Sequence, residues 1–241
     1  MSIISRGDCS SSADSFEKFL EGWVARQHTL LDELLKAQET HNNSLQESEI
    51  KDLIARTMAH FQEYYQEKSR MIRRNVFDVF SPTWLTSFEK ALLWVAGFHP
   101  DAAFDLVISS VDDLTSDQSE KIGSLMGKTE IEEKLLEDNL SKIQESVAAP
   151  PLAELARREG KRQLVEGEIR RAEAVPIKLR AAMESLVVDA DSLRRRVVQE
   201  LVEILCPLQN VRFLAAAAKA QLRIRASGME REVEQLNANG P

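Results

Sequence analysis

"DSFEKFLEGWVARQHTLLDELL", residues 14–35, carries the pattern that decides the fold class. Its apolar residues recur three and four positions apart, at Phe16, Phe19, Leu20, Trp23, Val24, Leu30, Leu31, Leu34 and Leu35. This spacing gathers them on one face of an α-helix, and Asp14 or Ser15 is a suitable N-cap. The segment therefore predicts a long amphipathic helix, which the polar run THNNS at 40–44 ends.

A second helix with the same spacing is expected from Glu47 to about Arg74, and it should pair with the first. The next segment, SPTWLTSFEKALLWVAGFHPDAAFDLV at 81–107, is richer in aromatic residues. Pro82 and Gly97 are typical of a helix start and a helix end. We therefore predict a buried helix at 83–96, a turn at 97–99 and a new helix from Pro100.

Aromatic side chains in this segment are predicted to form a structural core. They are Trp84, Phe88, Trp94 and Phe98. The alternative is that Trp84, Trp94 and Phe98 line a cavity for a ligand.

The C-terminal half continues the helical pattern. A long helix should begin at Asp113 or Thr115 and end at the AAPP run of 148–151, because proline cannot continue a helix. A charged helix to about Val175, a kink or restart at Pro176, and a last helix that ends at Gly228 should follow. Strand signals are nearly absent. We predict an all-α protein, a single elongated or bundled domain of roughly eight helices at 14–228, with tails at 1–13 and 229–241.

Composition excludes several classes of function. The net charge of −8 argues against specific DNA binding, which depends on phosphate neutralisation by lysine and arginine. No apolar run approaches the ~20 residues of a transmembrane helix, and the N-terminus has no secretory signal. The two cysteines, Cys9 and Cys206, form no disulfide framework, which fits a reducing compartment.

Catalytic motifs are missing from the sequence. HExxH, CxxC, GxSxG and the phosphate-binding glycine loops do not occur, so no enzyme activity is predicted. His60 and His99 have no histidine or cysteine neighbours in sequence, so no metal site is expected. His99, in the turn GFHPD, is expected to lie at the start of the following helix.

Three segments resemble one known family. The aromatic segment at 81–107, the opening FLEGW at 19–23, and 185–224 with its Leu205, Pro207 and Gln209 turn are similar to the plant delay-of-germination (DOG1) domain. TGA-type transcription factors carry this domain after a basic leucine zipper. No basic region or heptad pattern precedes Phe16, so the chain resembles a stand-alone member.

The resemblance implies regulation through protein contact. Stand-alone members act in seed dormancy and abscisic-acid signalling, in part by binding type-2C protein phosphatases, in the nucleus and/or the cytoplasm. The implied partner-binding residues are Asp14, Phe16, Phe19, Leu20 and Trp23. The alternative that this face packs on the second helix stays open.

The resemblance also raises haem, which the family's last helix is expected to hold through histidines. The stretch Lys219–Gly228 contains none, so no cofactor is predicted. A lipid or haem sensor with a buried apolar pocket and a transcriptional co-regulator remain as alternatives, and a homodimer is left open.

Overall fold

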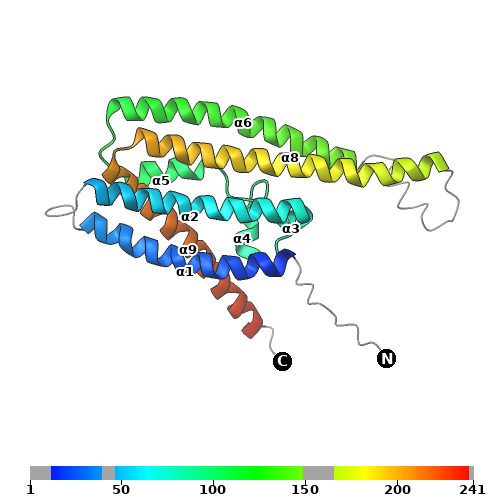
Figure 1. Cartoon of the computed structure of the whole chain (residues 1–241), viewed down its shortest axis with the longest axis horizontal. Helices are drawn as coiled ribbons and strands as arrows, with labels where there is room; N and C mark the ends of the chain where they lie inside the picture. Colours follow the sequence, from blue (N-terminus) through cyan, green and yellow to red (C-terminus); the bar gives the residue numbers. More distant parts are fainter. Residues whose placement is uncertain (1–11, 40–46, 149–165, 239–241) are drawn as a thin grey trace. The chain divides into compact units, whose positions relative to one another are not determined.

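A computed structural model describes residues 12–39, 47–148 and 166–238 (Figure 1). Over these ranges the chain is helical, with one isolated β-bridge and no strand, so the all-α prediction is confirmed. The helices are α1 (Ser12–Glu39), α2 (Glu47–Arg74), α3 (Phe77–Phe80), α4 (Ser87–Ala91), α5 (Ala102–Ser110), α6 (Ser116–Ala148), α8 (Glu166–Ile204) and α9 (Pro207–Ala238). In the described ranges, no helix is long and apolar enough to span a bilayer.

The chain divides into two compact units. Unit 1 consists of Met1–Leu92 together with Ala218–Pro241, and unit 2 consists of Leu93–Ala217. Unit 1 thus holds α1 to α4 and the C-terminal part of α9, while unit 2 holds α5, α6, α8 and the first turns of α9.

Unit 1 is built on the predicted pairing of α1 with α2 (Figure 1). The two helices are antiparallel, because Glu33 near the end of α1 pairs with Arg56 in the first half of α2 at 2.6 Å. Trp23, earlier in α1, contacts His60, later in α2. The apolar face of α1 supplies much of the core, which includes Phe16, Leu20, Trp23, Leu30 and Leu34.

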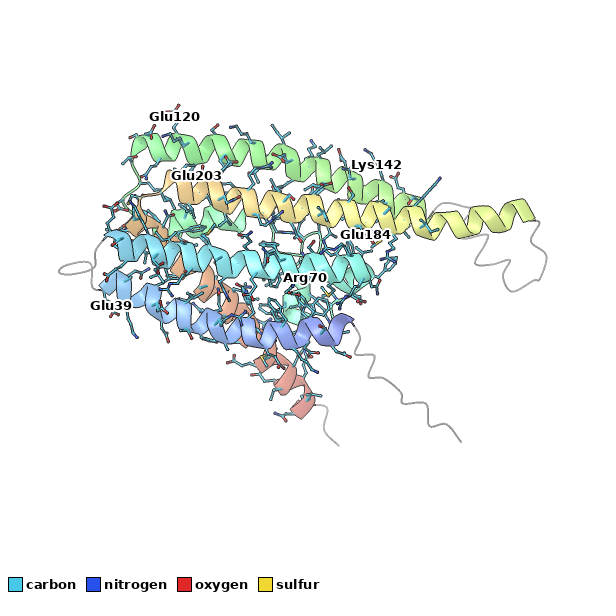
Figure 2. The ribbon with its side chains drawn as sticks, in the orientation of Figure 1. Glu39, Arg70, Glu120, Lys142, Glu184 and Glu203 are labelled. Carbon is cyan, nitrogen blue, oxygen red and sulfur yellow. The ribbon has the colours of Figure 1, made fainter. Side chains whose placement is uncertain are left out.

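Unit 2 is built on the antiparallel pair α6 and α8. Thr115 and Gln118 form a reciprocal cap at the start of α6, and the Gln118 amide also donates to the carbonyl of Ile204 at the end of α8. Further along, Arg196 of α8 bonds to Glu132 of α6. Charged side chains such as Lys142 point outward from this pair (Figure 2). Of the two predicted starts of α6, Asp113 and Thr115, the second is confirmed, since Ser116 is the first helical residue.

The predicted helix at 83–96 is wrong. The helix here is α4, Ser87–Ala91, which begins late because Thr86 caps it. The Thr86 hydroxyl accepts from the Glu89 N–H, and the Glu89 carboxylate accepts from the Thr86 N–H, which is a capping box. After α4 the chain makes a tight turn, in which Val95 and Ala96 have positive φ values of 41° and 57°. A helix cannot pass through two left-handed residues.

The aromatic core predicted in this segment is correct for Trp84 alone. Trp84 is buried in unit 1, whereas Phe88 is only half-buried there. Trp94 and Phe98 belong to unit 2 and are also half-buried. The single helix that was predicted to carry the first three of these rings is absent.

Two predicted helix boundaries in the C-terminal half also differ. α8 continues through Pro176 without a restart. The last helix passes Gly228 and continues to Ala238, so 229–238 is helical rather than a tail. The tail predicted at 1–13 is wrong at its last two residues, because α1 begins at Ser12, and its residues 1–11 lie outside the described residues. Residues 152–165 of the predicted charged helix also lie outside them.

Candidate interaction sites

The aromatic face of α1 packs into the interior of unit 1. Trp23 is 1% exposed, and its indole ring stacks on the His60 imidazole with ring centroids 4.3 Å apart and planes 10° from parallel. The indole N–H donates to the backbone carbonyl of His60 at 2.9 Å. Phe16 packs on Trp84, with centroids 4.9 Å apart, and on the edge of Tyr64. Trp23 is thus held by both shape and hydrogen bonding.

Burial sets the charge of His60 in this cluster. Desolvation, together with the nearby Arg26 guanidinium, lowers the pKa of His60 to about 4, so the ring is neutral at physiological pH. A neutral imidazole is suited to stacking on the Trp23 ring, since no charge has to be held in the core. The Nε2 atom of His60 is buried and makes no hydrogen bond.

The structure separates the five partner-binding residues that the resemblance implied. Phe16, Leu20 and Trp23 are buried, so an exposed apolar patch made by these three is absent. Phe19 is half-buried and Asp14 is exposed. The face packs against α2, as the alternative interpretation expected, because its spacing of three and four residues matches that of the α2 face.

A second contact in unit 1 joins α4 to the C-terminal part of α9. A Cβ atom at Gly228 would collide with the Thr86 hydroxyl oxygen and lie 3.0 Å from the Thr86 Cβ. Glycine at 228 therefore serves a close helix approach and not a helix end. Arg225 lies 3.4 Å from the buried Glu89 carboxylate, and the Arg231 guanidinium lies 4.0 Å above the Phe88 ring.

A different row of α9 is exposed and apolar. Met229, Val233 and Leu236 are 53%, 56% and 74% exposed, and they recur four and three positions apart. Residues at this spacing lie on one helix face. Glu230 and Glu234, both exposed, lie beside this row. Sequence reasoning missed this row because it ended the helix at Gly228, although the spacing itself continues beyond the glycine.

In unit 2, Arg194 of α8 holds the tight turn at 94–97. Its guanidinium donates to the carbonyls of Phe98 at 2.6 Å and Val95 at 3.0 Å, and also to that of Trp94. It bonds to the Asp191 carboxylate at 2.7 Å as well. A Cβ atom at Gly97 would lie 2.7 Å from the centre of this guanidinium, so a side chain there would force the guanidinium to shift.

Comparison with known proteins identifies the family. The DOG1 family, described as "Seed dormancy control", matches at residues 30–109, which include the C-terminal part of α1, all of α2 to α4 and most of α5. "Protein RESPONSE TO ABA AND SALT 1" of Arabidopsis thaliana is 36% identical over 228 residues, covering 92% of this chain and 98% of that protein. The chain belongs to the DOG1 family. The resemblance found in the sequence is thereby confirmed.

Two further relatives differ in how much of their length the chain covers. "Protein DOG1-like 4" of Arabidopsis thaliana is 33% identical, and the match covers 90% of this chain and 94% of that protein. "Transcription factor TGA10" of the same plant is 26% identical, over 92% of this chain but 48% of that protein. The chain therefore corresponds to nearly the whole length of the DOG1-like 4 protein and to about half the length of TGA10.

Proposed function

We propose that this chain is a non-enzymatic protein-interaction module that regulates abscisic-acid signalling in seed dormancy by binding type-2C protein phosphatases. The family's description and the name of the relative that responds to abscisic acid and salt support the pathway. The phosphatase as partner rests on the resemblance of the first helix to its family. Action in the nucleus and/or cytoplasm is part of the same proposal.

The observation that carries a contact role is the exposed apolar row Met229, Val233 and Leu236 on α9. Water contact with an apolar side chain costs about 25 cal/mol for each Å² exposed, so covering this row with a partner is favourable. An amphipathic helix that lays such a row into an apolar groove is a common recognition mode. The charged residues beside the row would form the rim of that contact.

The aromatic face of α1 has a supporting role in this proposal. Phe16, Leu20 and Trp23 are buried against α2, so they hold the unit together rather than meet the partner. Phe19, which is half-buried, and Asp14, which is exposed, are the members of the implied set with side-chain surface left for a contact.

The test is binding of purified chain to a plant type-2C phosphatase, measured by isothermal titration calorimetry. Val233→Glu combined with Leu236→Glu should weaken binding by about thirty-fold, the effect of losing a contact worth ~2 kcal/mol. Both side chains are exposed, so the double variant should fold.

The matched control is Ile131→Glu with Leu135→Glu on α6. These residues are 72% and 59% exposed and lie four positions apart, so they share one helix face as the α9 pair does. They should leave phosphatase affinity unchanged, because the same chemical change is made away from the proposed surface. Unchanged affinity of the α9 variant would remove α9 from the contact, and no binding by the wild-type chain would reject the phosphatase as partner.

A further inference from the structure

Three side chains with metal-binding chemistry meet in unit 2. His99 and Asp101 precede α5, and Glu133 lies in the middle of α6. His99 Nδ1 lies 2.7 Å from Asp101 Oδ1 and 3.2 Å from Glu133 Oε1. One ligand atom from each residue lies within 4.8 Å of the other two. The residues come from distant parts of the chain, so the sequence offered no spacing motif.

Two buried atoms of this cluster have no hydrogen-bond partner. Although His99 Nδ1 is close to both carboxylates, the geometry gives it no hydrogen bond to either, and Glu133 Oε1 also has no hydrogen-bond partner. Both atoms are buried, and Glu133 as a residue is 8% exposed. Buried polar atoms are nearly always satisfied in folded proteins. An acceptor of electron pairs placed among these atoms would satisfy all of them.

The charges around the cluster favour a cation. The carboxylates of Asp101 and Glu137 lie close enough to the buried Glu133 carboxylate to interact with it electrostatically, and the backbone of Asp101 hydrogen-bonds to it. Arg194 lies near by, but it is engaged by Asp191 and by the carbonyls of the turn. Among the described residues, no lysine or arginine forms a salt bridge with Asp101 or Glu133.

We propose that His99, Asp101 and Glu133 form a site for a divalent transition-metal cation such as Zn²⁺. Imidazole nitrogen and carboxylate oxygen are ligands that zinc prefers, at about 2.0 to 2.2 Å. Ligands at that distance lie about 3 to 3.5 Å from one another, which is near the separations observed here. Three protein ligands leave at least one position for water. The bound metal would tie the segment before α5 to the middle of α6.

The experiment uses the full chain after removal of metals with a chelator, and Zn²⁺ is titrated by calorimetry. One Zn²⁺ should bind per chain, and the thermal midpoint should rise because only the folded state holds the site. Glu133→Gln and His99→Asn should each lower the Zn²⁺ affinity by at least about ten-fold. Glu133→Gln keeps the side-chain shape and removes a buried carboxylate, so this variant should remain folded.

Two controls separate the site from other zinc ligands. Glu132→Gln changes the neighbouring residue, which pairs with Arg196 and lies outside the cluster, and should bind Zn²⁺ like the wild type. Cys206→Ser removes an exposed thiol and should also bind normally. The proposal is overturned if the wild type shows no binding up to millimolar Zn²⁺, if both ligand variants retain wild-type affinity, or if Cys206→Ser abolishes binding.

Discussion

Replacing Gly228 by alanine tests the contact between α4 and α9. Alanine favours a helix over glycine by about 1 kcal/mol, so the change alone would stabilise α9. The added Cβ, however, meets the Thr86 side chain, whose hydroxyl caps α4. Overpacking costs about 1 to 3 kcal/mol, and a lost N-cap costs about 1 kcal/mol. We expect Gly228→Ala to lower the free energy of unfolding by about 1 to 3 kcal/mol.

Gly22→Ala in α1 is the matched control. Gly22 lies in the same unit. A Cβ atom there would lie 3.6 Å from the Arg26 guanidinium, which is an ordinary van der Waals contact. Alanine should therefore stabilise the chain by up to about 1 kcal/mol. Urea unfolding followed by far-ultraviolet circular dichroism gives both values. The two variants should differ by about 2 to 4 kcal/mol, with opposite signs relative to the wild type.

A double-mutant cycle isolates the cause. If the collision with Thr86 is responsible, Gly228→Ala should cost less in a Thr86→Ala background, where the hydroxyl and methyl groups are gone. An equal cost in both backgrounds, or a Gly228→Ala variant as stable as Gly22→Ala, would refute the close approach of α4 and α9.

Three other predictions concern single side chains. The folded pKa of His60 is lowered to about 4, so the stability that its neutral ring contributes is present above the unfolded pKa near 6.5 and is lost as the pH falls toward 4. Between pH 7 and pH 4.5, the free energy of unfolding measured in urea should fall by about 2 kcal/mol more for the wild type than for His60→Gln. Trp84→Ala should cost about 3 to 5 kcal/mol and Trp94→Ala clearly less, because Trp84 is buried and Trp94 half-buried, and equal thermal midpoints would contradict this. Arg194→Met should lower the free energy of unfolding by about 3 kcal/mol or more in chemical denaturation, because the turn carbonyls lose their buried donor. Unchanged stability would show that the turn does not depend on Arg194.

Local pattern was sufficient to predict the long helices. The boundaries of α2 and the start of α6 follow from apolar spacing and from the Thr115 cap, which are both local in sequence. The fold class followed from the same periodicity. These features were predictable because each depends on residues within a few positions of one another.

The wrong predictions concern positions whose conformation or packing depends on residues far away in the sequence. Val95 and Ala96 adopt positive φ, at a cost of about 1 to 3 kcal/mol each, because Arg194 binds the turn from about a hundred positions away. Gly228 was taken as a helix end, although Thr86 is what requires it. No local signal reveals either contact.

The candidate sites also divide into features that local sequence predicts and features that depend on distant contacts. The α1 face was identified correctly as aromatic and one-sided, but its spacing alone did not decide between core and contact surface. The approach of His99 to Glu133 depends on how the segment before α5 meets α6. The α9 row was visible in the sequence once the helix is allowed to pass Gly228.

Hydrogen–deuterium exchange of the chain with and without a type-2C phosphatase tests most directly the claim that α9 meets the partner while α1 supports the fold. Amides in 229–238 should exchange more slowly when the phosphatase is bound, because the exposed row becomes covered. Amides around Trp23 should be unchanged, since that side chain is already buried against α2. Protection confined to 14–23, with 229–238 unaffected, would contradict the account and place the contact on the first helix.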